Sequence, residues 1–352
     1  MVLLTVGGTS LFLKKFSKKK PSLEKELNIF NWENYLSDEV IEDFEKKFGV
    51  KVNLDTFDDS DFAFSVIQSQ PDKYDLFVIE DDWVRQMINL KLLARLDHRK
   101  IPNLQNLKKE SRENPYDPGN QYCVPYVAGY TGILINTKYV KDFDGTRRIL
   151  WDEKYKGKIV MPNNSIEVLL NAAFALGLDP EKAKKEDFEK AKELALKQKD
   201  LVLGYYDPIT QRDLMINEKA WISYHYSTDV LPVLEKGSHF KFFAPKEGVL
   251  LWTDNWCIPK DAKNKEAAHA FLNYLLNPEV SAKNSKAIKT LMLTQGMEKY
   301  LDPKFVSQTQ GLDFPLDREI FLKSRYAIYA IGTETVQSIA NQLFSELEVT
   351  EE

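Results

Sequence analysis

A tryptophan and an aspartate two residues apart, Trp252 and Asp254, have the types and spacing best suited to ligand chemistry in this sequence. In an extended chain, residues i and i+2 point to the same side, so the indole face and the carboxylate could enter one cavity. An aromatic face beside a carboxylate suits an organic cation, through cation–π attraction and charge-assisted hydrogen bonds. The same pattern is compatible with a buried strand, whose tryptophan belongs to the core and whose aspartate caps the next turn.

Further rings and acids follow the predicted strands at residues 27–30 and 74–79. Open α/β sheets bind ligands beyond the carboxyl ends of their strands, so these side chains could meet in one cleft. A tyrosine in the extended segment at 122–136 could reach the same place. The candidates of this group are Trp32, Tyr35, Glu80, Asp81, Asp82 and Tyr126. The alternatives are that the rings belong to the core and its rim, and that one or two of the acids cap the following helix.

Apolar periodicity predicts the elements that position these side chains. In the first third of the chain, predicted strands alternate with helices that each have one apolar face. The predicted elements there are strands at 27–30, 50–57 and 74–79 and helices at 38–48, 62–69 and from 83 onward. This βαβαβα order predicts an open parallel sheet.

The pattern changes at residues 122–136, a long extended segment that could run out of one lobe and into another. The later predicted elements are strands at 158–161 and 221–226, helices at 165–176, 186–198 and 267–276, and one or two helices within 320–347. A length of 352 residues favours two lobes. Because no low-complexity linker separates them, we expect the chain to cross between the lobes more than once.

Composition and motifs exclude several function classes. The chain is 43% hydrophobic and 29% charged with a net charge of -5, and it has no basic stripe of the kind that binds nucleic acid. Its four histidines lack metal-ligand spacing, and it contains no phosphate-binding loop, nucleophile elbow or dinucleotide fingerprint. We therefore predict a protein that is not an enzyme and that uses neither a cofactor nor a metal ion.

Two cysteines, Cys123 and Cys257, lie in apolar stretches that could be neighbouring strands, so a disulfide is possible. The favoured interpretation is two reduced, buried thiols.

The N-terminus resembles part of an export signal. Residues 1–13 are mostly small or apolar, and five lysines follow between 14 and 20. The apolar segment is too short to span a bilayer and lacks the basic region that normally precedes it. We predict a leader over residues 1–26; the alternative is a basic leader on a cytoplasmic protein.

Several short motifs occur in a fixed order. They are Asn31-Trp32-x-x-Tyr35, Tyr74-Asp75-Leu76, Pro125-Tyr126, Thr131-Gly132-Ile133, Tyr155-Lys156-Gly157-Lys158-Ile159, Pro245-Lys246-Glu247-Gly248, Trp252-Thr253-Asp254, Ala262-Lys263-Asn264-Lys265-Glu266-Ala267 and Leu272-Asn273-Tyr274-Leu275-Leu276-Asn277-Pro278-Glu279. The ordered set resembles the bacterial spermidine/putrescine-binding proteins of polyamine ABC importers, the PotD/PotF group. The resemblance covers residues 27–276 well and the remainder more loosely.

The resemblance implies a two-lobed periplasmic-binding-protein fold of type II, an α/β fold with mixed, mainly parallel sheets and crossing hinge strands. The first lobe would comprise residues 27–130 plus 252–302, and the second 131–251 plus 303–352. It also implies a monomeric, periplasmic or extracytoplasmic receptor that delivers its ligand to an ABC permease. Association with the membrane would occur only through the permease or an uncleaved leader, and no nucleic acid would be bound.

The resemblance also implies ligand-binding positions. Those that match the family in type are Trp32, Tyr35, Glu167, Trp252 and Asp254, with Glu167 binding a terminal amine. Tyr126, in the crossing segment, is a further candidate. Six positions depart from the family. Glu80 and Asp82 stand where the family has a serine and a tyrosine, and Asn164 stands where it has an aspartate. Tyr224, Thr290 and Tyr326 stand where it has a tryptophan, a tyrosine and a glutamine, respectively. The departures move carboxylates toward the first lobe.

Carboxylate number bears on the ligand, because each buried ammonium group needs an anionic partner. Asp254, Glu167 and at least one of Glu80 and Asp82 could supply three anions, which favours spermidine over putrescine. The alternatives are a receptor of the same fold for a sugar, thiamine or a metal chelate, and a cytoplasmic interaction protein that responds to polyamines.

Overall fold

The computed structural model describes residues 23–58, 60–112, 114–314, 317–326 and 334–349. The predicted leader lies outside these residues except for its last four positions, 23–26. Within the described part of the chain, no helix is both long enough and apolar enough to cross a membrane.

The first third of the chain forms the alternating strands and helices that its periodicity predicts. These elements are β1 (Glu26–Trp32), α1 (Asp38–Phe48), β2 (Lys51–Phe57), α2 (Ser60–Ser69), β3 (Leu76–Glu80) and α3 (Asp81–Asn89). β1 pairs in parallel with β2 on one side and with β3 on the other, as predicted. Helix α1 has two acids in its first turn and ends at Gly49, whose φ of 68° suits a residue without Cβ.

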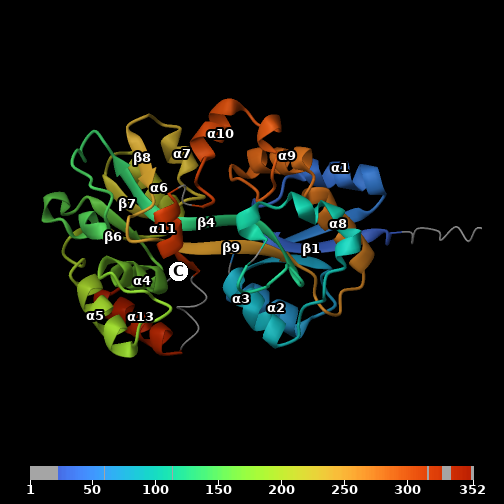
Figure 1. Ribbon diagram of the computed structural model, residues 1–352, viewed down its shortest axis with the longest axis horizontal. Coiled ribbons are helices and arrows are strands. Elements are labelled where there is room, and N and C mark those ends of the chain that lie inside the picture. Colours follow the sequence, from blue (N-terminus) through green and yellow to red (C-terminus); the bar gives the residue numbers. More distant parts are fainter. Residues whose placement is uncertain (1–22, 59, 113, 315–316, 327–333, 350–352) are drawn as a thin grey trace, which may run out of the picture.

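Two long strands, β4 (Cys123–Asn136) and β9 (Leu250–Cys257), run side by side between the two parts of the molecule (Figure 1). They pair antiparallel with each other, from Cys123 opposite Cys257 to Tyr130 opposite Leu251. β9 also pairs antiparallel with β3, and β4 continues beyond Tyr130 to pair with strands of the second part. The segment predicted to cross between lobes is therefore a strand, and the sheet is mixed because β4 and β9 add antiparallel pairs to it.

The second part contains a smaller parallel set of strands covered by helices. Its elements are β5 (Ile159–Pro162), α4 (Ser165–Ala175), α5 (Lys185–Leu196), β6 (Val202–Tyr206), α6 (Pro208–Ile216), β7 (Ile222–Tyr226), α7 (Leu231–Leu234), β8 (Phe240–Phe243) and α13 (Glu334–Leu347). β5 pairs in parallel with β6 and β7, while β4 pairs antiparallel with β7 and β8. The strand order is β2-β1-β3-β9-β4-β7-β5-β6.

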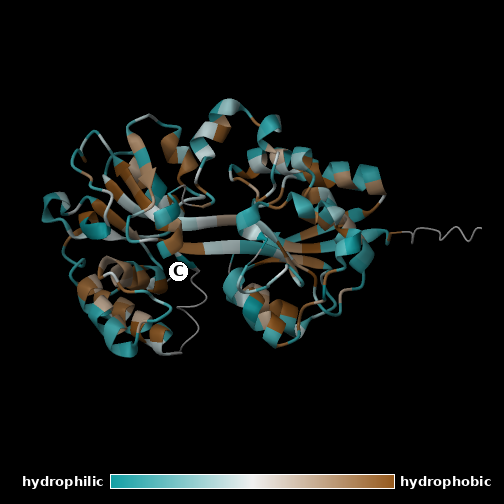
Figure 2. Cartoon of the chain, viewed as in Figure 1, coloured by the Kyte–Doolittle hydropathy of each residue, from teal (hydrophilic) through white to brown (hydrophobic). Residues whose placement is uncertain are grey.

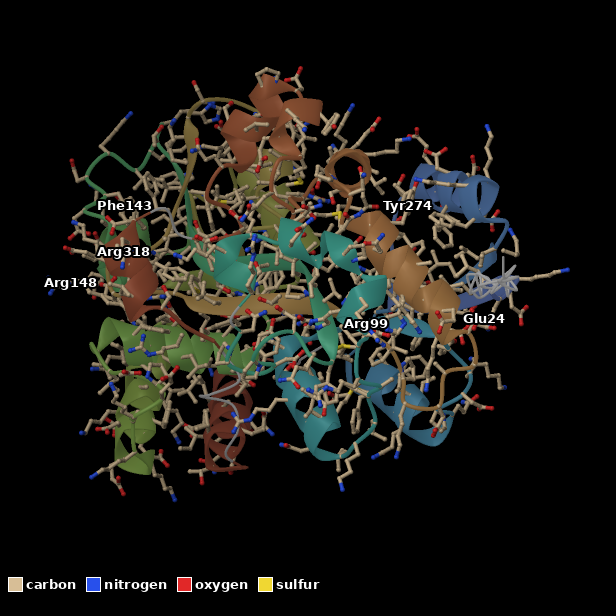
Figure 3. All side chains as sticks on the ribbon, turned by 45° about the vertical axis from the view of Figure 1, so that its right-hand side comes forward. Glu24, Arg99, Phe143, Arg148, Tyr274 and Arg318 are labelled. Carbon is tan, nitrogen blue, oxygen red and sulfur yellow. A yellow bond between two sulfur atoms is a disulfide. The ribbon has the colours of Figure 1, made fainter. Side chains whose placement is uncertain are left out.

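The remaining helices and one short strand follow β9. They are α8 (Lys265–Leu275), α9 (Pro278–Ile288), α10 (Pro303–Thr309), α11 (Arg318–Lys323) and β10 (Arg325–Tyr326), which pairs with β9. Short 3-10 turns occupy His98–Lys100, Pro102–Asn106, Lys109–Ser111, Arg147–Trp151, Glu153–Tyr155 and Glu298–Tyr300. Figure 3 shows Glu24 at the N-terminal end of α8, where its carboxylate accepts a hydrogen bond of 2.8 Å from the backbone of Ala267.

Separate hydrophobic cores occupy the two parts, and Figure 2 shows apolar segments inside each of them. One core contains Phe44, Trp256 and Phe271, and is completed by a smaller cluster around Phe77. The other contains Phe174 and the buried face of α13. Two cores joined by crossing strands are what a two-lobed fold requires, whereas the exact boundaries of the two lobes stay a prediction.

The two cysteines form a disulfide, so the prediction of two reduced thiols is wrong. Cys123 and Cys257 are directly opposite each other in the β4–β9 pair, with 4.6 Å between their Cα atoms. That separation lies within the range that a disulfide can bridge. Sequence pattern identified both strands but could not fix their register, on which the pairing depends.

Candidate functional site

A cavity of about 770 Å³ lies where elements of the two parts meet. Its walls come from the carboxyl ends of β1, β2, β3 and β7, from the starts of α2, α3 and α4, and from β9. Eight of its lining residues are acidic: Asp58, Asp61, Glu80, Asp81, Asp82, Glu167, Asp229 and Asp254. Five are aromatic: Trp32, Tyr35, Trp83, Tyr226 and Trp252. Among the lining residues that the structure describes, there is no lysine, arginine or histidine.

Asp254 occupies the middle of this arrangement. β9 places it directly opposite Glu80 of β3, and the hydroxyl of Tyr35 donates a hydrogen bond of 2.7 Å to its Oδ2. Only 6% of its surface is exposed, and burial raises the pKa of the Asp254 carboxyl to about 7, although the Tyr35 hydrogen bond opposes the shift. A carboxylate held this way is costly to ionise alone and favours a cation beside it.

Three consecutive acids, Glu80 to Asp82, form one wall of the cavity, which we call the acidic wall. Glu80 ends β3 and accepts a hydrogen bond of 2.6 Å from the hydroxyl of Ser60. Burial, followed by the neighbouring carboxylates of Asp82 and Asp254, raises the pKa of Glu80 well above its usual value.

The other two acids of the wall stand in the first turn of α3. Asp81 accepts a 2.9 Å hydrogen bond from the backbone of Thr253 through Oδ1, which ties the start of α3 to β9. Asp82 accepts one of 2.7 Å from the backbone of Trp83. Asp82 therefore bonds to a backbone N–H in the first turn of α3, whereas the bond of Asp81 goes to β9 and does not cap the helix. Glu80, the N-cap residue, makes no side-chain cap bond.

Glu167 contributes a carboxylate from the second part of the molecule. It lies in the first turn of α4, and its Oε1 accepts a hydrogen bond of 2.9 Å from the hydroxyl of Thr131. Its Oε2 is buried and has no partner among the described residues. Burial raises the pKa of Glu167 to about 7. Asn164 is the N-cap of α4 and accepts a 3.0 Å hydrogen bond from the backbone N–H of Glu167, so it orients the helix that carries this acid.

The aromatic lining is held by packing beneath it. Trp32 packs against Phe57 with 4.5 Å between ring centroids, and Trp83 stacks on Phe64 at 4.2 Å. Trp252 lies so close to Gly129 of β4 that any Cβ there would overlap its ring. The indole N–H of Trp252 is buried and has no acceptor among the described residues. The alternative of Trp252 as a purely core residue does not fit, because the side chain is half-buried and lines the cavity.

Nine of the candidate residues therefore share one cavity: Trp32, Tyr35, Glu80, Asp81, Asp82, Asn164, Glu167, Trp252 and Asp254. Three others lie behind or away from it. Tyr126 is buried and donates a hydrogen bond of 2.5 Å to the carbonyl of Tyr35. Tyr224 is buried beside the guanidinium of Arg147, and Thr290 donates to the carbonyl of Thr228. The fourth, Tyr326, lies in β10, and its side chain is outside the described residues.

Sequence reasoning did not select several residues that line the cavity. Asp58 and Asp61 follow β2, whereas Tyr226 ends β7 and Asp229 follows it. The rule that ligands bind beyond the carboxyl ends of parallel strands would have found them, had it been applied to these two strands as well.

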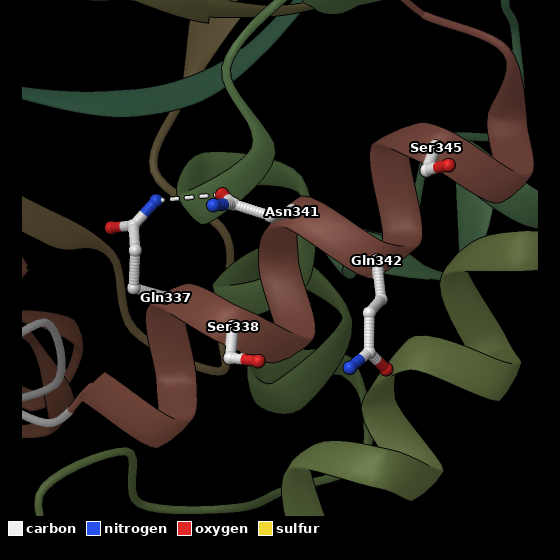
Figure 4. Close-up of a pocket in the computed structure, with 5 residues that line it drawn as sticks. All are labelled: Gln337, Ser338, Asn341, Gln342 and Ser345. Carbon is white, nitrogen blue, oxygen red and sulfur yellow. Dashed lines mark hydrogen bonds between the residues drawn. The ribbon is translucent and has the colours of Figure 1, made fainter.

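A second hollow, of about 580 Å³, lies on the exposed face of α13 (Figure 4). Gln337, which also lines the main cavity, donates a hydrogen bond of 2.9 Å to Asn341 there. All of the side chains that line this hollow are polar and uncharged. In the described part of the chain, no group of three or more histidine, cysteine or acidic residues is arranged to hold a metal ion. The cavity with the carboxylates is accordingly the candidate site.

Comparison with known proteins agrees with this fold. The family model described as bacterial extracellular solute-binding protein matches residues 39–310. The chain is 28% identical to spermidine/putrescine-binding periplasmic protein 1 of Haemophilus influenzae, over 74% of this chain and 73% of that protein. It is 27% identical to the putrescine/agmatine-binding protein of Pseudomonas aeruginosa, over 82% of each.

A solved structure extends the comparison. The spermidine/putrescine ABC transporter substrate-binding protein PotD of Streptococcus pneumoniae superposes with a TM-score of 0.83 at 25% identity, covering 92% of this chain and 99% of that chain. The predicted resemblance, fold, extracytoplasmic location and lack of enzymatic activity are confirmed by these matches. This chain belongs to the bacterial extracellular solute-binding proteins.

Proposed function

We propose that this protein captures a polyamine between its lobes and delivers it to an ABC permease. The observation that carries the proposal is a cavity lined by eight carboxylates and five aromatic rings, with no cationic side chain among its described lining residues. A polyamine is a string of ammonium groups joined by methylenes, and it complements both features. The names of the relatives, which bind spermidine, putrescine or agmatine, support the same ligand class.

Three carboxylates are the proposed partners of three ammonium groups. Asp254 takes the central group, Glu167 takes a terminal group from the second part, and Glu80 or Asp82 takes the other terminal group. Rings that flank these acids would cover the methylenes, exclude water and strengthen each ion pair, with about 0.5–2 kcal/mol per cation–π contact. Because a diamine can use only two of the three anions, we infer that spermidine binds more tightly than putrescine.

The crossing strands support capture by lobe closure. β4 and β9 join the two parts, and the proposed partners of the ligand come from both of them. A cation that contacts both parts favours the closed arrangement, and a permease could recognise that arrangement. The buried disulfide suits an oxidising compartment outside the cytoplasm. We propose that the receptor acts as a monomer.

Titration calorimetry of the purified protein tests the proposal. Spermidine and putrescine are each titrated at neutral pH, with an uncharged sugar as a matched negative ligand. We expect saturable binding of both polyamines, tighter binding of spermidine, and no heat from the sugar. Absence of binding by both polyamines, or equal binding of the sugar, would overturn the proposal. Tighter binding of putrescine would overturn only the order of preference.

A further inference from the structure

The acidic wall, Glu80 to Asp82, holds more carboxyl groups than a triamine uses. Under the proposed function, Asp254 and Glu167 take two ammonium groups, and one residue of the wall takes the third. The remaining acids of the wall line the same cavity. They are left without a role in triamine binding, so their presence needs another explanation.

Helix position explains only part of this charge. Acids in the first turn of α3 are favoured by the helix dipole, which covers Asp81 and Asp82. Glu80 precedes the helix, makes no cap bond and is held in place by Ser60 instead. Asp81 is 2% exposed, and its Oδ2 is buried with no partner among the described residues. A buried carboxylate oxygen is stabilised by a hydrogen-bond donor, and an ammonium group is such a donor.

Strand pairing places this charge next to the middle of the site. Glu80 is directly opposite Asp254 in the antiparallel β3–β9 pair, and like charges at such positions are destabilising. A cation on each side of this pair would relieve the repulsion. A ring is also present at this end, because Trp83 follows Asp82, lines the cavity and is fixed by stacking on Phe64. The wall thus offers both an anion and a ring, the two features that complement an ammonium group and its methylenes.

We propose that the acidic wall is an additional ammonium subsite, so that this protein binds a linear tetraamine more tightly than a triamine. Glu80 and Asp82 would each take one ammonium group, with the unpartnered Oδ2 of Asp81 as a further acceptor between them, while Asp254 and Glu167 take the other two. This inference rests on the proposed function, and it assigns Glu80 and Asp82 as the residues that set preference according to the number of charges on the ligand.

Calorimetric titration with putrescine, spermidine and spermine tests the inference, using the full chain and the variants Glu80→Gln and Asp82→Asn. Asp261→Asn, which removes an exposed acid that does not line the cavity, is the matched control. For the unmodified protein, we expect spermine to bind at least tenfold more tightly than spermidine. Each site variant should weaken spermine binding at least tenfold and spermidine binding less than threefold, because one acid of the wall remains to serve the triamine. The control should change neither affinity.

Two results would overturn the inference. One is that the unmodified protein binds spermine no more tightly than spermidine, a comparison that does not depend on the folding of any variant. The other is that each site variant weakens both ligands by the same factor. If spermidine binds and spermine gains nothing, the additional subsite is refuted and the proposed function stands. If no polyamine binds, the proposed function fails as well.

Discussion

Replacing Asp254 by asparagine is the most informative single change, because it removes one charge while keeping the shape of the side chain. The Tyr35 hydroxyl, 2.7 Å from Oδ2, can still donate to the amide oxygen. What is lost is the buried anion opposite Glu80. The variant should therefore fold normally, and the effect should be confined to cation binding.

The expected loss follows from the strength of charge-assisted hydrogen bonds. A hydrogen bond to a charged group contributes about 1.5–3 kcal/mol. At about 1.4 kcal/mol for each factor of ten, spermidine affinity should fall about 10- to 150-fold. The unliganded variant should be at least as stable as the original protein, since removal of one of two opposed carboxylates relieves about 0.2–1 kcal/mol of repulsion.

Calorimetry with spermidine and thermal unfolding of the unliganded protein provide the two readouts. Weaker binding together with an unchanged or higher Tm would support a carboxylate that acts on the ligand. Unchanged affinity would remove Asp254 from the site. A fall in both quantities would show that the aspartate serves the fold, and it would refute a role confined to cation binding.

Four further predictions concern Glu167 with Asn164, the pH dependence of binding, the pH dependence of stability, and the disulfide. Glu167→Gln should weaken spermidine binding about tenfold or more. Asn164→Ala should mainly lower the free energy of unfolding by about 1 kcal/mol, because it removes the N-cap of α4. Equal losses of spermidine affinity in the two variants, measured by calorimetry, would contradict these separate roles. Because burial raises the pKa of Asp254 and Glu167 to about 7, a cation must displace protons from both, and polyamine affinity should rise between about pH 6 and pH 8. Because these two raised pKa values make the folded chain bind more protons than the unfolded chain, the free energy of unfolding of the unliganded protein should fall as the pH rises from about 4 to about 7. A free energy of unfolding that rises over this pH range, measured by urea unfolding, would disprove the prediction. Reduction of the Cys123–Cys257 bond, which closes a loop with a sequence separation of 134 residues, should lower the free energy of unfolding by about 2–5 kcal/mol, and an unchanged urea midpoint would contradict this estimate.

Local pattern was sufficient for much of the fold and for the centre of the candidate site. β3 lies in a continuous apolar run, β2 has apolar residues on alternate positions, and α1 carries its own start and stop signals, so each could be predicted from neighbouring residues. Trp252 and Asp254 were selected because two side chains at i and i+2 share a face, and the structure brings both to one cavity. Glu80 and Asp82 were selected because ligands in open α/β sheets bind beyond the carboxyl ends of the strands, and both residues line the cavity.

Features that depend on pairing between distant segments could not be predicted. The disulfide requires the register of β4 against β9, which neither strand encodes alone. Tyr126 has the same type of side chain as some of the lining residues, but it is buried in the core. Its hydroxyl donates a hydrogen bond to the backbone carbonyl of Tyr35. Helices α6, α9 and α10 were not predicted, because their apolar residues show little helical periodicity. Each begins with a proline that follows an N-cap aspartate or asparagine, and this pair of residues is the main sequence signal for their start.

The disulfide between β4 and β9 also limits how the two parts of the molecule can move. A covalent bond between opposite residues prevents these strands from sliding past each other, so shear along them is excluded and only bending and twisting remain. A slip of one residue would turn every side chain of β9 to the other face of the sheet, Trp252 and Asp254 included. The bond therefore fixes the register that keeps the indole and the carboxylate on the cavity side of the sheet.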